Sequence, residues 1–124
     1  MVLVDTSVWV SHLREGNKEL ADLLNDGRVL SHPFIIGELA CGNLKDRAVI
    51  LSYLKLLPLS IEAEPEEVLS FIEDNRLMGQ GLGYVDVHLI TSAVLTGVSL
   101  WTFDKKLAQA SDSLRINYFF KKSR

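Results

Sequence analysis

The sequence has little cysteine and no excess of positive charge. Its one cysteine, Cys41, cannot form a disulfide within the chain, so we expect a protein of a reducing compartment, the cytoplasm. The 13 Lys and Arg against 16 Asp and Glu give a formal charge of −3, which excludes a global basic field for binding nucleic acid. Any role on nucleic acid would therefore need local positive charge or a bound metal ion.

Signals for targeting and for membrane insertion are also lacking. Met1 leads directly into Val2–Val4, without the basic stretch and cleavable apolar region of a signal peptide. The uncharged segment Val87–Phe103 is interrupted by hydroxyl residues, glycine and histidine, which predicts a buried helix and a buried strand rather than a membrane span. No linker, repeat or low-complexity segment divides the chain, so we expect one domain over residues 1–124.

What the sequence does contain is an alternation of short apolar segments and helical patterns. The predicted strands are Val2–Val4, Arg28–Ser31, Leu59–Ile61, Val98–Phe103 and Leu114–Phe120. The predicted helices are Val8–Leu13, Lys18–Asp26, Phe34–Cys41, Leu44–Leu57, Pro65–Met78, Val85–Thr96 and Lys105–Ala110. Short strands separated by helices are typical of an α/β fold, in which helices cover both faces of a parallel sheet.

Four carboxylates occupy positions where acids are uncommon. Asp5 and Asp104 directly follow predicted core strands. Glu38 is the one charge in an apolar helix, and Asp86 lies at the start of another. Because functional sites of parallel sheets form at the carboxyl ends of the strands, Asp5 and Asp104 lie where such a site is expected.

Simpler roles remain open for each acid taken alone. Asp5 or Asp104 would cap the helix that follows it, and Asp86 would be a favourable charge at a helix N-terminus. The simpler role for Glu38 is a buried ion pair with an arginine. The candidates for that arginine are Arg28 and Arg76.

If the four acids converge, their repulsion requires protons or a cation. Two unit charges ~4 Å apart repel by about 4 kcal/mol at an effective dielectric constant of ~20, so such a cluster takes up protons or binds a cation. The ligands would all be hard oxygens, which favours Mg²⁺ or Mn²⁺ over zinc. Neighbouring hydroxyls could orient the carboxylates or their waters. These hydroxyls belong to Thr6, Ser7 and Thr102.

In order and spacing, these motifs resemble the PIN-domain ribonucleases, in particular the VapC toxins of toxin–antitoxin pairs. The resemblance runs nearly end to end and rests on Val4-Asp5-Thr6-Ser7, Glu38, Asp86 before Val87–Ile90, and Thr102-Phe103-Asp104. It implies a three-layer α/β/α fold around a central parallel sheet. It also implies a site for one or two Mg²⁺ or Mn²⁺ ions, cleavage of single-stranded RNA such as tRNA, a homodimer, and a small VapB-like antitoxin.

Carried over residue by residue, the resemblance implies that Asp5, Glu38 and Asp86 are the core catalytic carboxylates. Asp5 and Asp86 would hold the metal, and Glu38 would bind metal or position the attacking water. Asp104 would be a fourth, more variable metal ligand. The reaction would be phosphodiester hydrolysis that leaves 5′-phosphate and 3′-hydroxyl ends.

Two further groups of residues are weaker candidates. Lys105 or Lys106, beside Asp104, could contact RNA phosphates. The histidines have no neighbouring acid at metal-ligand spacing, so we expect structural or surface roles for them. These histidines are His12, His32 and His88.

Two other function classes compete with the ribonuclease. A non-catalytic PIN-like binding module would use the apolar content of 48% for a partner surface. An Asp-based phosphatase or receiver domain would need a second acid near Asp5. Position 7 is serine, and no acidic pair accompanies the first strand, so this class is disfavoured.

Overall fold

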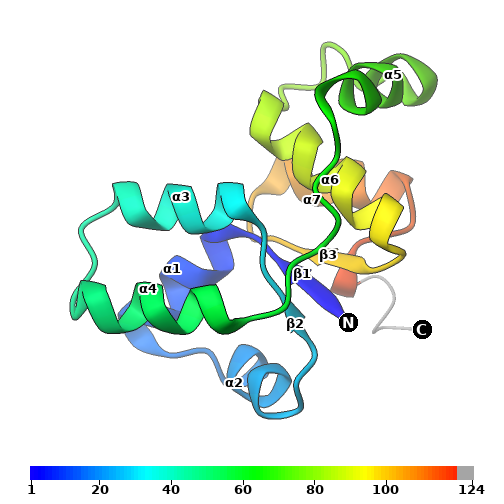
Figure 1. Cartoon of the computed structure of the whole chain (residues 1–124). Helices are drawn as coiled ribbons and strands as arrows, with labels where there is room; N and C mark the ends of the chain where they lie inside the picture. The colour runs from blue at the N-terminus through cyan, green and yellow to red at the C-terminus, as the bar shows by residue number, and fades with distance from the viewer. Residues whose placement is uncertain (120–124) are drawn as a thin grey trace.

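The structure, a computed structural model, describes residues 1–119 and contains there three strands and seven helices (Figure 1). The strands β1 (Val2–Val4), β2 (Val29–Leu30) and β3 (Ser99–Trp101) form one parallel sheet in the order β2-β1-β3. The α/β fold with a central parallel sheet, predicted from the sequence, is therefore confirmed.

Helices cover both faces of this sheet. Their bounds are α1 (Thr6–Glu15), α2 (Lys18–Asn25), α3 (Pro33–Cys41), α4 (Arg47–Leu56), α5 (Pro65–Asn75), α6 (Tyr84–Thr96) and α7 (Lys105–Ser113). In Figure 1, α1 to α4 lie on one side of the strands and α5 to α7 on the other, which is the expected three-layer arrangement. No helix within residues 1–119 is long and apolar enough to cross a membrane.

β1 is the centre of the hydrophobic core. Its residues are at most 1% exposed, because neighbouring strands pair with both of its edges and helices cover both of its faces. Leu3 lies opposite Leu30 of β2 and Leu100 of β3. The Asp5 backbone N–H donates to the Trp101 carbonyl oxygen at 2.9 Å. The ladder of hydrogen bonds thus carries Asp5 to the carboxyl edge of the sheet.

Two of the five predicted strands are wrong. Leu59 forms only an isolated parallel bridge with Ser31, and Asn117 forms one with Leu100. The Asn117 side chain accepts a hydrogen bond from the backbone N–H two residues later. Such local bonding competes with a strand ladder, and residues 118 and 119 are not part of a strand. Phe120, the last residue of that predicted strand, lies outside the described residues.

Most predicted helices agree with the structure to within a few residues, and left-handed residues explain two of the differences. Asp46 has φ 53° and precedes α4, which begins at Arg47 rather than at Leu44. Arg76 has φ 52° and follows α5, which ends before the predicted Met78. A left-handed conformation cannot continue an α-helix, so these residues set the helix bounds.

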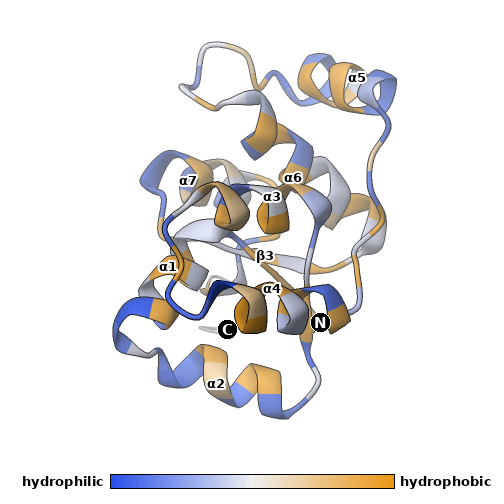
Figure 2. Ribbon diagram, turned by 60° about the vertical axis from the view of Figure 1, so that its left-hand side comes forward, coloured by the Kyte–Doolittle hydropathy of each residue, from blue (hydrophilic) through white to orange (hydrophobic). Residues whose placement is uncertain are grey.

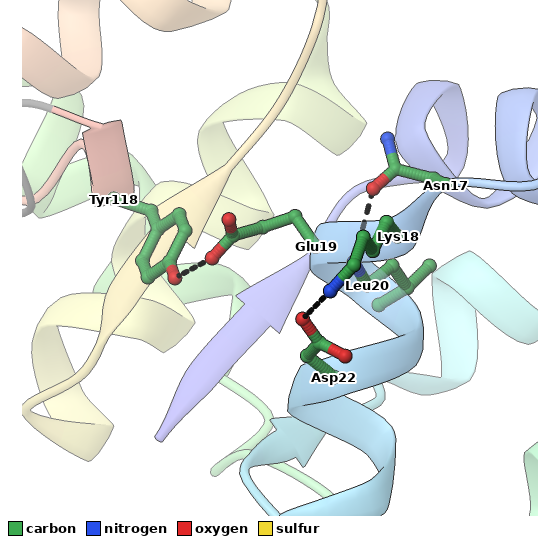
Figure 3. Close-up of polar contacts among 6 residues, drawn as sticks. All are labelled: Asn17, Lys18, Glu19, Leu20, Asp22 and Tyr118. Carbon is green, nitrogen blue, oxygen red and sulfur yellow. Dashed lines mark hydrogen bonds and ion pairs between the residues drawn. The ribbon is translucent and has the colours of Figure 1, made fainter.

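α2 is amphipathic, and Tyr118 connects it to the last described residues. Figure 2 shows hydrophilic and hydrophobic residues alternating along α2, and its buried residues are Leu20 and Leu23. The Tyr118 hydroxyl donates to Glu19 Oε2 at 2.6 Å (Figure 3). Burial and this hydrogen bond to the carboxylate raise the pKa of Tyr118 to about 12, so the phenol remains a donor at neutral pH.

Candidate functional site

Asp5 lies at the N-cap position of α1, but its carboxylate does not cap the helix. The Asp5 backbone carbonyl accepts hydrogen bonds from the N–H groups of Val8 and Trp9. Its side chain is 7% exposed, and Oδ2 accepts from the hydroxyls of Ser7 at 2.8 Å and Thr102 at 2.7 Å. The simpler role of Asp5, a side-chain helix cap, is therefore wrong.

Ser7 and Thr102 also join the ends of β1 and β3. Ser7 Oγ accepts from the Phe103 N–H at 2.9 Å, and Thr102 Oγ1 accepts from the Asp104 N–H at 3.0 Å. Each hydroxyl thus accepts from a backbone amide and donates to Asp5. A carboxylate that receives two hydroxyl donors is held in one orientation.

Glu38 lies on an exposed part of α3, although its apolar surroundings in the sequence suggested burial. Glu38 Oε1 accepts a hydrogen bond from Thr6 Oγ1 at 2.7 Å. Thr6 directly follows Asp5, so this bond connects α3 to the end of β1. Neither Arg28 nor Arg76 pairs with Glu38 in the part of the chain that the structure describes, and the alternative of a buried ion pair is wrong.

Asp86 and Asp104 lie at the starts of α6 and α7. Asp86 Oδ2 accepts from the Gly83 N–H at 3.0 Å, and Asp104 Oδ1 accepts from the Leu107 N–H at 2.8 Å. Asp104 is thus a helix cap, as its simpler role predicted. Burial raises the pKa of Asp86, the Gly83 N–H opposes that rise, and the charges of Asp5 and Asp104 add to it. The structure therefore brings these three acids within electrostatic range of one another.

The four acids share one geometric feature. One oxygen of each carboxylate is held by the chain, and the other forms no hydrogen bond with any residue from 1 to 119. The held oxygens are Oδ2 of Asp5, Oε1 of Glu38, Oδ2 of Asp86 and Oδ1 of Asp104. A carboxylate fixed through one oxygen presents the other in a defined direction, which is how supporting hydrogen bonds orient metal ligands.

This set of donors fits a hard divalent cation that keeps part of its hydration shell. Burial is the main cause of the raised pKa of Asp86, and the charges of Asp5 and Asp104 add to it. Among the described residues, no three His, Cys, Asp or Glu side chains are already gathered at a spacing that could hold a metal ion. Mg²⁺ suits such spacing, because it usually keeps several waters and binds only one or two carboxylates directly.

His32 is completely buried. Its Nδ1 accepts from the Phe34 N–H at 3.0 Å at the start of α3, and its Nε2 lies 3.2 Å from Ser92 Oγ of α6. Because Nδ1 is an acceptor, we assign the neutral ring proton to Nε2, which then donates to Ser92. Burial and the neighbouring His88 lower the pKa of His32 to about 4.

His32 therefore joins the helix of Glu38 to the helix of Asp86. Its predicted structural role is confirmed by its complete burial, but the link between the two helices was missed. The signal available in the sequence was His32-Pro33 before an apolar helix. Proline favours the first position of a helix, so the residue before it is expected at the N-cap. His88 is also buried, at 2% exposure.

We expect Asp86→Asn to stabilise the metal-free protein. The change removes a charge that burial and two neighbouring acids disfavour, and the amide oxygen can still accept from Gly83. The melting temperature in chelator should rise by roughly 2–4 °C, and Mg²⁺ should raise it for the parent but not for the variant. Calorimetry with and without Mg²⁺ measures both effects. The matched control is Asp112→Asn, because Asp112 is an exposed residue of α7. A lower melting temperature for Asp86→Asn than for the parent in chelator would contradict the prediction.

Comparison with known proteins identifies relatives over most of the chain. The family model of the PIN domain matches residues 2–112, a range that includes all four acids. The chain is 45% identical over 111 residues to Ribonuclease VapC32 of Mycobacterium tuberculosis, in the strains CDC 1551 / Oshkosh and ATCC 25618 / H37Rv. The match covers 89% of this chain and 90% of that relative. The resemblance inferred from the sequence motifs is confirmed.

Solved structures agree with this fold. FitAcB from Neisseria gonorrhoeae aligns with a TM-score of 0.64 and 21% identity, over 90% of this chain and 94% of that one. PAE2754 from Pyrobaculum aerophilum aligns with a TM-score of 0.57 and 18% identity, over 91% and 85% of the two chains. At such low identity the two structures support the fold alone. From the family match and the close relative together, the chain belongs to the PIN-domain family, as a homologue of the VapC ribonucleases.

Proposed function

We propose that this chain is a metal-dependent endoribonuclease of the VapC toxin type that hydrolyses single-stranded RNA, with tRNA as the first substrate to test. The observation that carries the proposal is the set of four carboxylates, each held by the chain through one oxygen. The ribonuclease that is 45% identical to this chain supports the same activity.

In this proposal, Asp5 and Asp86 bind the ion, and Glu38 binds it or positions the attacking water. Asp104 completes the acidic shell. The all-oxygen donors favour Mg²⁺, with Mn²⁺ as the alternative. A bound divalent ion would act as a Lewis acid toward the phosphate and would lower the pKa of a water bound to it.

The supporting hydroxyls have a separate task in this proposal. Ser7 and Thr102 hold the Asp5 carboxylate in one orientation through two hydrogen bonds. Thr6 holds Glu38 in the same way from the start of α1. Removing a side chain that hydrogen-bonds to a metal ligand commonly reduces metal affinity or activity by about 10- to 100-fold.

The proposal includes a homodimer, a VapB-like antitoxin and a cytoplasmic location. Support for a protein partner comes from α4, where Val49, Tyr53 and Leu56 are 56%, 67% and 80% exposed. Residues at these spacings lie on one face of a helix. The free chain thus exposes an apolar stripe of the kind that protein interfaces cover.

We expect the purified chain to cleave RNA in Mg²⁺ and to lose this activity in excess chelator. Attack by water leaves 5′-phosphate and 3′-hydroxyl ends, whereas attack by the ribose 2′-hydroxyl would leave a 2′,3′-cyclic phosphate. Direct ligation of sequencing adapters to the products distinguishes these ends and identifies the RNA that is cut. Cleavage that persists in chelator, or products with cyclic phosphates, would refute the metal-dependent hydrolysis.

Calorimetric metal titration tests the competing interpretation, a non-catalytic PIN-like binding module. Binding of Mg²⁺ or Mn²⁺ that is lost in Asp5→Asn supports the enzyme. A parent protein that binds neither ion and cuts no RNA would favour the module.

A further inference from the structure

Lys106 occupies a notch that Gly81 leaves open. A Cβ atom at Gly81 would lie 2.6 Å from Nζ and 2.7 Å from Cδ of Lys106. The end of the lysine side chain therefore fills the space that any other residue at position 81 would need. Gly81 also has φ +77°, a left-handed conformation that favours glycine.

This contact places the ammonium group of Lys106 against the loop that precedes α6. Gly81 belongs to the loop before α6, and two residues later the Gly83 N–H donates to Asp86. Lys106 belongs to the first turn of α7, two residues after Asp104. The lysine side chain thus connects the loop that holds one acid to the helix that another acid caps.

The ammonium group of Lys106 forms no ion pair with a carboxylate in residues 1–119, so its charge is available to a ligand. An ammonium binds phosphate as a compact point charge. Lys105 is also exposed and, like Lys106, its side chain forms no hydrogen bond or ion pair among the same residues. Of the two lysines, Lys106 is the one whose side chain lies against Gly81.

Building on the proposed function, we propose that Lys106 binds a backbone phosphate of the RNA next to the cleavage site, and that Gly81 is the positioning residue for this lysine. The absence of a side chain at position 81 leaves room for the ammonium group against the loop that leads to Asp86. The role is electrostatic and independent of base sequence, as expected for a phosphate contact.

The test uses the full chain carrying Asp5→Asn, so that RNA is bound without being cut. The probe is a fluorescein-labelled pool of random single-stranded RNA, and anisotropy gives its affinity over a series of salt concentrations. Lys106→Ala should weaken binding by about 3- to 10-fold and reduce the slope of log K against log salt by about 0.7, the value for one phosphate of a single strand. Gly81→Ala keeps the charge but displaces the lysine, and should cause most of the same loss.

Gly79→Ala is the matched control for Gly81→Ala. Gly79 has φ +73°, and no atom lies within 4 Å of a Cβ placed there, so the substitution adds similar backbone strain without displacing Lys106. Its affinity for RNA should remain that of the parent. The double variant Gly81→Ala/Lys106→Ala should bind no more weakly than Lys106→Ala alone, because the notch and the lysine act as one unit. Lys105→Ala should weaken binding less than Lys106→Ala.

Three results would overturn the assignment. The first is that Gly81→Ala binds RNA as tightly as Gly79→Ala, and the second is that the losses of affinity in Gly81→Ala and Lys106→Ala add in the double variant. The third is that Lys105→Ala and Lys106→Ala lose equal affinity. Cleavage kinetics with Asp5 intact separate this inference from the proposed function. A raised KM at unchanged kcat in Lys106→Ala supports the phosphate contact. If the parent is active and Lys106→Ala has unchanged kinetics, the phosphate contact is refuted and the proposed function stands. If the parent neither binds nor cuts RNA, the proposed function is refuted as well.

Discussion

Replacing Asp5 by asparagine is expected to reduce RNA cleavage by at least about 100-fold while the protein keeps its fold. The amide oxygen of asparagine can still accept from Ser7 and Thr102, and the backbone hydrogen bond to Trp101 is unchanged. What is lost is the negative charge at the one acid of the site that is nearly completely buried. Activity and stability should therefore separate in this variant.

Initial rates on single-stranded RNA and melting temperatures of the same preparations test this separation. Asp22→Asn is the matched control, because Asp22 is a surface residue paired only with Lys18 on α2 (Figure 3), and its cleavage rate should equal that of the parent. Thr102→Val, which removes one supporting hydroxyl at nearly constant volume, should give an intermediate loss of about 10-fold. Asp5→Asn with a rate within tenfold of the parent would exclude Asp5 from the catalytic centre.

The second large effect is a loss of stability in mild acid that depends on His32. Burial, together with His88, lowers the pKa of His32 to about 4 in the folded protein, against about 6.5 in an unfolded chain. Between these values the unfolded chain binds a proton that the folded chain excludes, so the free energy of unfolding falls as the pH falls. The stability that His32 contributes in its neutral form is fully present above about pH 7, and about 2–3 kcal/mol of it is lost by about pH 4.5.

Urea unfolding at a series of pH values measures this loss, and the comparison variant is His32→Asn. Asparagine is a good N-cap, so it can replace the hydrogen bond to Phe34 without carrying a titratable group. The variant should be less stable than the parent at neutral pH and should have a flatter dependence on pH. His12→Gln is the control, since His12 is only half-buried. Equal slopes for the parent and His32→Asn would show that another group causes the acid sensitivity.

The positions of the acids along the sheet could be predicted because they follow from local patterns. A β-branched apolar segment predicts β1, the next residue must lie at its carboxyl end, and Asp5 is that residue. The same reasoning places Asp104 after β3. In a parallel sheet the carboxyl ends of the strands lie at one edge, so local sequence predicts that both acids lie at this edge. That β1 and β3 are neighbouring strands was supplied by the structure.

The orientation of Glu38 could not be predicted in the same way. A helix reveals its buried face only through the contrast of polar and apolar positions, and Pro33–Cys41 is apolar or small at every position except Glu38. The contrast that Figure 2 shows along α2 is therefore lacking in α3. Rotation of α3 about its axis is decided by packing against α1 and α4, and this rotation leaves Glu38 exposed and within reach of Thr6.

Partners that are distant in the sequence were also beyond local reasoning. His32 and Ser92 are 60 residues apart, and nothing around either residue specifies the other. The Lys106–Gly81 contact is of the same kind, because a glycine in a loop normally suggests only a turn. Contacts between side chains of separate helices can be identified only once the positions of the helices are known. These contacts shape the site as much as the acids do.

The central position of β1 has a consequence for the order in which the chain acquires its chemistry during synthesis. Asp5 leaves the ribosome well before Thr102, which holds its carboxylate and is 97 residues further along the chain. β3, which completes one edge of β1, is made just before Thr102. A nascent chain, or one ended by an early stop codon, has the first acid of the centre without the strand and hydroxyl that orient it. The proposed nuclease is therefore inert until synthesis has passed Thr102.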